Sequence, residues 1–492
     1  MEGEGGGGGG GGGGDGDRLS SLPEHIIHHI FSFLDTIAVV KATAVSRKLR
    51  YFLVSMPYLN FESNGYFDSQ SKIKFNDFVN WVLMSRNRSV DIQRFRISYF
   101  YLNENYAFYR LMHVITGCNL QELDLMIRSK DEIELPRCIL NCRSLVSLKL
   151  SFDHYSLGTF PGLKNCIFPG FIRLKSLELC FVMFMDSLSL ANFVSSCPYL
   201  ENLSVHECTF VDDNIIEITA TSLKDLSIIL PPGQKWYKER IRTEQIRNYG
   251  LKIACPNLVS LKVVNLRSRK FSFQETNSLQ NLFMDLHRQY DNLKVEQCCQ
   301  ALCKMLKGVC NVKALKVSEV FLEYLLLAVD IPESFSPLFN NLKSLTLGIR
   351  RTDFNKHSLI NMLECSPNLE TLNIFLKLSI FRTDFPFMPK DPWKMPNMPN
   401  GTTSCLKYHL KIVELFHVRD DKYELDLVKF FLKYGHILQK MRISWVHGHG
   451  NTDEIISEIM KFPRSSPNVA LTFVEPNDIS LNGKSYGCYC YA

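Results

Sequence analysis

A six-residue pattern, Leu-x-x-Leu-x-Leu with conservative replacements, recurs thirteen times between residues 92 and 443. The copies lie about 29 residues apart on average, with irregular gaps. In each copy the last two apolar positions alternate with polar residues, which predicts a short strand that buries one face. No copy buries that face alone, so the copies are expected to stack into one core. The first positions are Ile92, Leu120, Leu145, Leu174, Leu200, Leu223, Leu258, Leu279, Val312, Leu342, Leu369, Leu410 and Leu438.

This period and pattern resemble leucine-rich repeats, in which each repeat contributes one strand and a return segment. The resemblance implies an α/β fold for residues 57–384, a curved solenoid of irregular repeats with parallel strands on its concave face. The clearest copies begin at Leu145, Leu174 and Leu342, and the poorest begins at Leu279.

Cysteine often precedes a copy, and the examples are Cys118, Cys142, Cys197, Cys255 and Cys365. A small apolar side chain suits the tight entry to a strand, so these thiols are expected to be structural rather than reactive. The chain holds 16 cysteines in 492 residues and starts Met-Glu-Gly-Glu, unlike a secretory signal. We therefore expect reduced thiols and a cytoplasmic or nuclear location.

Residues 1–16 are dominated by glycine and hold 12 of the 27 glycines. Ordering such a segment costs much backbone entropy, so a disordered leader is expected. A phosphate-binding loop would need a preceding strand and a following Gly-Lys-Ser or Gly-Lys-Thr, and the sequence has neither.

Residues 17–56 predict a short module of three helices. Pro23 suits the first turn of a helix, where its missing N–H is not needed. Asp35 or Thr36 is placed to cap a second helix, and Ser46 to cap a third. So small a core is marginal by itself and is expected to depend on a neighbour or partner. The first helix carries a wide apolar stripe at helical spacing, made of Ile26, Ile27, Ile30, Phe31 and Leu34.

The same module resembles an F-box. The resemblance rests, in chain order, on Leu22-Pro23-Glu24, Ile27, Ile30 to Leu34, Val40 and Val45 to Lys48. In that family these positions dock on the adaptor subunit of an SCF ubiquitin ligase. The implied adaptor-binding residues are Leu22, Pro23, Ile26, Ile27, Ile30, Phe31, Leu34, Val40 and Val45. Leu49 stands where the family usually has tryptophan, and its smaller contact area suggests weaker adaptor binding.

The C-terminal part begins with a proline-rich connection at 385–403. It continues with a segment, 404–474, that predicts a strand at 410–415, an amphipathic helix at 424–433 and a strand at 438–443. This order resembles the FBD domain of plant F-box proteins. Such a region could close the repeat stack or bind a partner, and the pattern leaves both roles open. Residues 475–492 form a tail.

Three further features have a functional and a structural interpretation. The insertion at 231–250 is basic and holds Trp236, as a nucleic-acid or phosphoprotein site would, yet its acidic residues favour a solvated loop. The four cysteines between 298 and 310 lack the paired spacing of a zinc site. His447 and His449 lack a third ligand nearby. We therefore expect neither a metal nor a cofactor.

Composition and absent motifs exclude several classes of protein. The chain has 56 Lys and Arg against 50 Asp and Glu, and a net charge of +6 is too weak for a dedicated nucleic-acid binder. No apolar run reaches the length of a membrane helix. No acyl-transfer elbow, zinc helix, P-loop, kinase set or dinucleotide fingerprint occurs, so we interpret the chain as non-catalytic.

Together the resemblances imply the substrate-recognition subunit of an SCF-type E3 ubiquitin ligase from a plant. The implied partners are the adaptor, through it the cullin and RING subunits, and an unknown protein target, with no nucleic acid and no membrane. Target contacts are expected on outward strand positions: Asp124, Lys149, Glu178, His206, Lys262, Asn373 and Phe375. One alternative is a repeat scaffold outside any ligase, capped by the N-terminal helices. Another is an F-box hormone receptor, which would need a pocket ringed by Arg and Lys.

Overall fold

The chain divides into two compact units, 1–161 with 167–182, and 162–166 with 183–492. In the computed structural model the described residues are 21–45, 47–62, 69–102, 105–129, 133–152, 158–160, 171–184, 187–210, 215–231, 250–266, 271–286, 300, 302–303, 305–306, 308–322, 324, 339–350, 356–377, 403–419, 422–446 and 452–474. The predicted leader at 1–16, the proline-rich segment up to residue 402 and the tail at 475–492 lie outside them.

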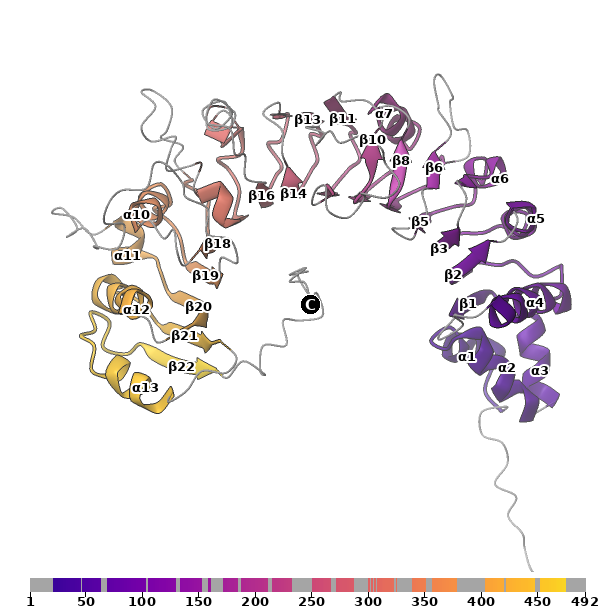
Figure 1. The fold of residues 1–492 in the computed structure, drawn as a ribbon, viewed down its shortest axis with the longest axis horizontal. Coiled ribbons are helices and arrows are strands. Elements are labelled where there is room, and N and C mark those ends of the chain that lie inside the picture. The colour runs from indigo at the N-terminus through magenta and orange to yellow at the C-terminus, as the bar shows by residue number, and fades with distance from the viewer. Residues whose placement is uncertain are drawn as a thin grey trace, which may run out of the picture. The chain divides into compact units, whose positions relative to one another are not determined.

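The N-terminal module folds as three helices, α1 (Glu24–Phe31), α2 (Thr36–Val45) and α3 (Arg47–Val54) (Figure 1). Pro23 occupies the N-cap of α1, where a backbone N–H is not required. Of the two candidate caps for α2, Asp35 has the role, because the Ala38 amide donates to Asp35 Oδ1 across 2.5 Å. Thr36 is buried instead, and its hydroxyl accepts a hydrogen bond of 2.9 Å from the backbone N–H of Asn60. This bond ties α2 to the first strand.

The first unit continues as a parallel sheet with helices in its return segments. Its strands pair in the order β1 (Tyr58–Glu62), β2 (Arg94–Leu102), β3 (Glu122–Ser129), β5 (Ser147–Phe152) and β7 (Ser176–Cys180). The return segments hold α4 (Ser69–Ser85), α5 (Asn105–Thr116), α6 (Arg137–Leu140) and two short paired strands, β4 (Ile133–Glu134) and β6 (Gly158–Phe160).

The second unit repeats this arrangement with more strands. Its parallel sheet runs in the order β9 (Asn202–His206), β12 (Asp225–Ile229), β14 (Ser260–Leu266), β16 (Asn281–Leu286), β17 (Ala314–Val317), β18 (Ser344–Arg350), β19 (Thr371–Lys377), β20 (Ile412–Val418), β21 (Lys440–Trp445) and β22 (Ala470–Val474).

The return segments of the second unit contain helices and a second set of short strands. The helices are α7 (Ser187–Ser195), α10 (Lys356–Glu364), α11 (Ser404–Tyr408), α12 (Lys422–Tyr434) and α13 (Thr452–Met460). The short strands are β8 (Val182–Phe184), β10 (Thr209–Phe210), β11 (Ile215–Thr219), β13 (Gly250–Ala254) and β15 (Phe271–Gln274). In Figure 1 the strands β18 to β22 lie on the inner side of this unit and α10, α12 and α13 on its outer side.

Every predicted copy of the repeat pattern leads into a strand, from β2 after Ile92 to β21 after Leu438. The poorest copy, at Leu279, still forms β16. The expected parallel sheet is therefore confirmed. Two strands at the ends, β1 and β22, were not predicted. The segment that leads into β1 has Met56 where the pattern has its first leucine, and this methionine is fully buried.

The core is a ladder of inward side chains in register. In the second unit its members, each at most 2% exposed, are Leu203, Leu226, Leu261, Leu282, Leu315, Leu345, Leu372, Val413 and Met441. Burying one such side chain contributes roughly 1.5–3 kcal/mol. The outward neighbours form equally regular rows on the face of the sheet. No helix of the described residues is long and apolar enough to cross a membrane.

Candidate functional site

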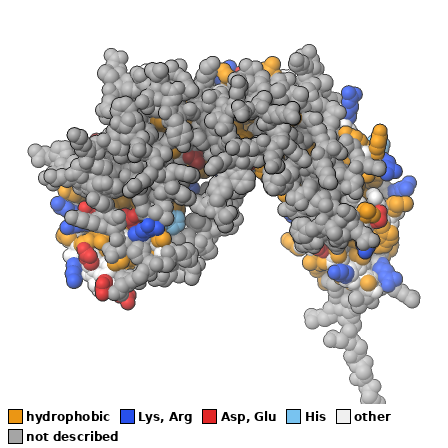
Figure 2. All heavy atoms as spheres, viewed as in Figure 1, with side chains coloured by type: hydrophobic (Ala, Val, Ile, Leu, Met, Phe, Trp, Pro, Cys, Tyr) orange, Lys and Arg blue, Asp and Glu red, His pale blue; other side chains and the backbone are white. Residues whose placement is uncertain are grey.

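The apolar stripe of α1 has a buried and an exposed part. Ile27 and Phe31 are 0% and 1% exposed and pack inside the module. Ile26 and Leu34 are 37% and 38% exposed, and Phe33, just beyond the helix, is 76% exposed. Figure 2 shows apolar side chains among basic ones over these N-terminal helices. Large apolar side chains left in water beside a filled core are typical of a docking surface.

A polar contact fixes α1 against α3 behind this surface. Ser55 Oγ donates to Glu24 Oε1 across 2.9 Å and lies 3.2 Å from His28 Nε2. His28 Nε2 also lies 3.3 Å from the Phe52 carbonyl oxygen, which accepts only, so this nitrogen carries the proton. Burial is the main cause that lowers the pKa of His28, so its ring is neutral at pH 7. The exposed apolar residues therefore lie on a helix that paired polar groups hold against α3.

The structure divides the predicted adaptor-binding residues between surface and interior. Those that reach the surface, wholly or in part, are Leu22, Pro23, Ile26, Ile30, Leu34 and Val40. Ile27 and Phe31 are buried in the interior of the module. The side chain of Val45 lies outside the described part of the chain.

Two exposed aromatic residues of the module, Phe33 and Tyr51, are absent from the predicted adaptor-binding set, and Tyr51 is 68% exposed. Phe33 lies beyond the end of α1, so helical spacing does not place it, but it stands within the F-box-like motif. Leu49 is only 4% exposed, so its side chain belongs to the packed interior of the module.

Charged residues of neighbouring strands pair on the outward face of the parallel sheet of the first unit, called here the first sheet. Arg96, Asp124, Lys149 and Glu178 form one register row across β2, β3, β5 and β7. Arg96 Nε lies 3.3 Å from Asp124 Oδ2, and Lys149 Nζ lies 2.8 Å from Glu178 Oε1. Burial raises the pKa of Asp124, against the opposing effect of the two cations. The three predicted target-binding residues of this unit are thus all in ion pairs, Asp124 with Arg96 and Lys149 with Glu178.

The other predicted target-binding residues lie on the face of the second sheet and are His206, Lys262, Asn373 and Phe375. Lys262 and Asn373 belong to one register row, and two residues that sequence reasoning missed, Phe283 and Lys316, stand between them. Both occupy the position between the last two apolar residues of their copies. Lys149 and Glu178 were predicted because they occupy this outward position, and the same criterion applied to every copy would have found Phe283 and Lys316.

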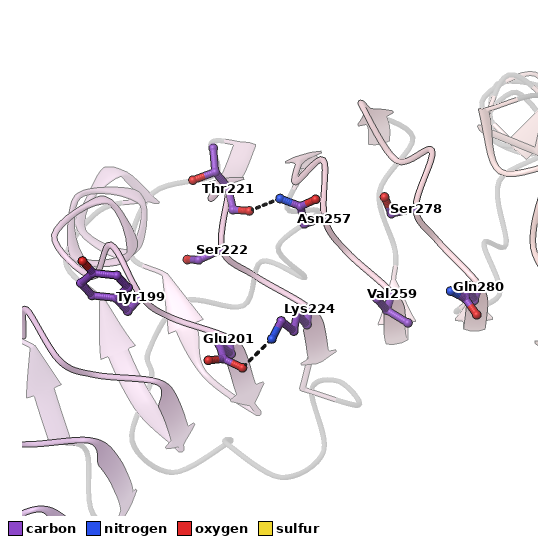
Figure 3. Close-up of a pocket in the computed structure, with 9 residues that line it drawn as sticks. All are labelled: Tyr199, Glu201, Thr221, Ser222, Lys224, Asn257, Val259, Ser278 and Gln280. Atoms are coloured by element: carbon purple, nitrogen blue, oxygen red, sulfur yellow. Dashed lines mark hydrogen bonds and ion pairs between the residues drawn. The ribbon is translucent and has the colours of Figure 1, made fainter.

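A groove of about 570 Å³ runs along the edge of the second sheet where its strands begin (Figure 3). Its lining is polar: Lys224 Nζ lies 2.8 Å from Glu201 Oε2, and Asn257 Nδ2 donates to the Thr221 carbonyl across 2.7 Å. The groove carries one lysine, already paired, rather than a ring of cations. It gives no support to a hormone pocket.

A second groove, of about 730 Å³, lies in the first unit. Arg143 and Arg173 line it together with residues of the turns that precede β5 and β7. This position is at the strand starts and not under the sheet face, where a hormone pocket would have to lie. Neither groove therefore favours the small-molecule alternative.

Three of the described cysteines at the strand entries, Cys142, Cys197 and Cys255, are buried, as expected for structural thiols. Cys197 and Cys255 are 2% and 0% exposed, and Cys197 Sγ lies 3.3 Å from the Phe193 carbonyl oxygen. Burial raises the pKa of Cys197 to about 12. A thiol with so high a pKa stays protonated and unreactive at neutral pH.

Several features weighed in the sequence lie outside the described residues. They are Cys298, Cys299, His447, His449 and most of the basic insertion, 232–249. Cys303, of the same cysteine group, is described and is 4% exposed.

Three family models match successive parts of the chain. F-box-like matches residues 19–59, the LRR repeats of FBD-associated F-box protein At5g56370 match 108–240, and FBD matches 399–443. The first covers the three-helix module, the second falls on the parallel strands, and the third covers β20 and α12 and most of β21. Because β19, β20, β21 and β22 pair in sequence, the FBD region continues the parallel sheet as further repeats.

Proteins of Arabidopsis thaliana resemble the chain over most of its length. F-box/LRR-repeat protein At4g14096 is 27% identical over 444 residues, which cover 86% of this chain and 87% of that protein. F-box/FBD/LRR-repeat protein At3g26920 is 25% identical, with 93% and 96% covered. F-box/LRR-repeat protein At4g14103 is 26% identical, with 72% and 91% covered. The predicted resemblance to plant F-box, leucine-rich-repeat and FBD proteins is confirmed.

Proposed function

We propose that this chain, which combines an F-box-like region, leucine-rich repeats and an FBD region, is the substrate-recognition subunit of an SCF-type E3 ubiquitin ligase. Proteins with an F-box and leucine-rich repeats are generally substrate adaptors of such ligases. The observation that carries the proposal is the apolar surface of Ile26 and Leu34 of the α1 stripe together with Phe33, which is 76% exposed. The module has a packed core, and hydrogen bonds hold its helices together. An exposed apolar surface on such a module is suited to a protein partner.

The proposed mechanism is proximity. The exposed stripe binds the adaptor, and through it the cullin and RING subunits, while the face of the repeat sheet holds the target. Holding the target near the reactive subunits raises their effective concentration without chemistry in this chain. The chain is thus proposed to be non-catalytic, with ubiquitin transferred by other subunits. The described cysteines are free thiols, which fits the cytoplasm or nucleus.

The test is binding of the full chain to a purified plant SCF adaptor by calorimetry. Phe33→Ala and the double variant Leu22→Ala/Pro23→Ala are compared with the unaltered chain. If the stripe is the docking surface, Phe33→Ala weakens binding by roughly tenfold or more, as removal of an aromatic anchor does. Leu188→Ala removes an equally prominent apolar side chain, 64% exposed, from α7 and serves as the matched control.

Each outcome of this comparison decides between two roles. Loss of binding in the stripe variants, with binding kept in Leu188→Ala, supports the ligase subunit. A folded unaltered chain that does not bind any SCF adaptor excludes that role. The three helices would then be the cap of a repeat scaffold.

A further inference from the structure

The groove of the first unit, of about 730 Å³, has a basic lining. It is lined by the end of α5, by α6, which lies beside α5 (Figure 1), and by the turns that precede β3, β5 and β7. Its basic lining residues are His113, Arg143 and Arg173, and no acid occurs among the lining residues that the structure describes. We call it the arginine groove.

The two arginines of the groove stand on adjacent turns. Lys175, two residues after Arg173, donates a backbone hydrogen bond of 2.8 Å to the carbonyl oxygen of Val146, three residues after Arg143. Neighbouring strands of a sheet lie roughly 4.8 Å apart. Because both arginine side chains are exposed, their guanidinium groups can reach the same short stretch of a bound chain.

Arg173 stands at a place in its copy where the two preceding copies have a short polar residue. Asn119 Nδ2 donates to Asp91 Oδ2 across 2.9 Å, and Ser144 Oγ donates to the Leu120 carbonyl oxygen across 2.7 Å. Each of these bonds ties one turn to the turn before it. Within the described residues the guanidinium of Arg173 makes neither a hydrogen bond nor an ion pair, so it does not take part in this ladder of bonds.

Cations at other strand starts are paired with an acid of a neighbouring copy. Arg94 pairs with Glu122 in the first sheet, and Lys224 Nζ lies 2.8 Å from Glu201 Oε2 in the second. Arg143, like the other arginine of the groove, has no such partner in the part of the chain that the structure describes. The arginine groove therefore carries positive charge that attracts an anionic ligand.

Exposed apolar side chains stand beside these cations. Ile172, next to Arg173, lines the groove and is 46% exposed, and Val114 of α5, next to His113, is 52% exposed. The volume of the groove also exceeds that of one small anion and is in the range of pockets that hold larger ligands. Arginine together with exposed apolar area is typical of a surface that binds a protein segment.

We propose that the arginine groove binds an acidic segment of a partner protein. Two carboxylates at alternate positions of an extended segment pair with Arg143 and Arg173. Alternate side chains of such a segment share one face and lie roughly 7 Å apart, so both carboxylates face the groove. A guanidinium binds a carboxylate through two parallel hydrogen bonds, which gives the pairing its specificity. The proposal rests on the proposed function, because it names the chemical class of the target.

The test begins with random peptides displayed on phage and selected on the immobilised full chain. The enriched peptides are expected to carry two Asp or Glu residues separated by one residue. The double variant Arg143→Ala/Arg173→Ala should lose this acidic preference. Enriched peptides without an acidic preference, a preference that survives in the double variant, or no enrichment at all would each overturn the proposal.

A selected peptide then gives the affinities by fluorescence anisotropy. The double variant should weaken binding roughly tenfold or more, and so should replacing the peptide's Asp and Glu by Asn and Gln. Arg173→Lys should weaken binding roughly threefold, because lysine keeps the charge but not the two parallel bonds. Arg88→Ala removes an exposed arginine of the same unit outside the groove and is the matched control. Equal losses in Arg88→Ala and the double variant contradict a specific site.

The same preparations separate this inference from the proposed function. The double variant should bind the SCF adaptor as the unaltered chain does, because none of the lining residues belongs to the three-helix module. Adaptor binding without acidic-peptide binding overturns the inference alone. Acidic-peptide binding by a chain that does not bind the adaptor overturns the proposed function and supports the arginine groove.

Discussion

The backbone amide of Asn87 donates a hydrogen bond of 3.1 Å to the carbonyl oxygen of Val54. Asn87 follows α4, and Val54 ends α3, so the bond joins the three-helix module to the first return segment of the repeats. Because that module is too small to be very stable alone, its link to the repeats is part of its folding.

Arg86 strengthens the same junction. It is 8% exposed, and its guanidinium donates to the Met56 carbonyl and, across 3.3 Å each, to those of Val90 and Asp91. Arg86→Met should lower the free energy of unfolding by about 1–3 kcal/mol, since it leaves buried carbonyls without a donor. Urea unfolding of the full chain measures the change. Arg88→Met, at an exposed position, is the control, and an equal effect of both would contradict the role of Arg86.

Leu49 gives a second prediction, on the packing of the three-helix module. Its side chain is 4% exposed, so Leu49→Ala should cost about 2–5 kcal/mol through a cavity. Leu49→Trp should also destabilise, by about 1–3 kcal/mol, because the site is already filled. Thermal unfolding and adaptor binding are measured together. A tryptophan variant that binds the adaptor more tightly at unchanged stability would show that this position contacts the partner.

Much of the fold follows from the periodicity of apolar residues. Each copy places two side chains, such as Leu148 and Leu150, on one face of a strand, and burial of that face fixes the register of the stack. The short strands β11, β13 and β15 were not predicted. They lie in return segments of irregular length, where no repeated spacing marks the buried positions.

The candidate site was predictable only in part. Helical spacing identified the α1 stripe, but packing within the module, including that of α1 on α3, decides that Ile27 is buried and Ile26 exposed. Similarly, strand positions identified Asp124 and Lys149, whereas their ionic partners come from residues about one repeat away in the chain. Such partners become visible only when the copies are aligned in register.

Thiol reactivity gives a third prediction. Burial raises the pKa of Cys197 to about 12 and that of Cys405 to about 11. Both should resist alkylation at pH 8, because the thiolate is the reacting form. Cys310, which is partly exposed, should react before either of them. Mass spectrometry after timed iodoacetamide treatment follows each site, and early labelling of Cys197 in the folded chain would contradict its structural role.

The last prediction concerns Glu370, which lies between two lysines at the strand starts of the second sheet. Its carboxylate is 2.7 Å from Lys343 Nζ and 3.0 Å from Lys411 Nζ. Hydrogen bonds from Lys343 and Lys411 lower its pKa to about 2 from an ordinary value of 4.5. A lowered pKa in the folded state means that the stabilisation is fully present above the ordinary value and is lost as the pH falls from about 4.5 through about 2. The effect is modest, because about a third of the side chain is exposed to solvent.

The variant Glu370→Gln isolates this contribution. The unaltered chain should melt at a higher temperature than the variant at pH 6, and the difference should shrink between pH 4.5 and pH 3, because the Glu370 carboxylate of the unfolded chain gains a proton there. Added salt at about 1 M should reduce the difference at pH 6, since it screens exposed ion pairs. Glu458→Gln, at an exposed position of α13, is the control. A melting difference that stays constant from pH 6 to pH 3 would show that the two lysines do not stabilise the carboxylate of Glu370.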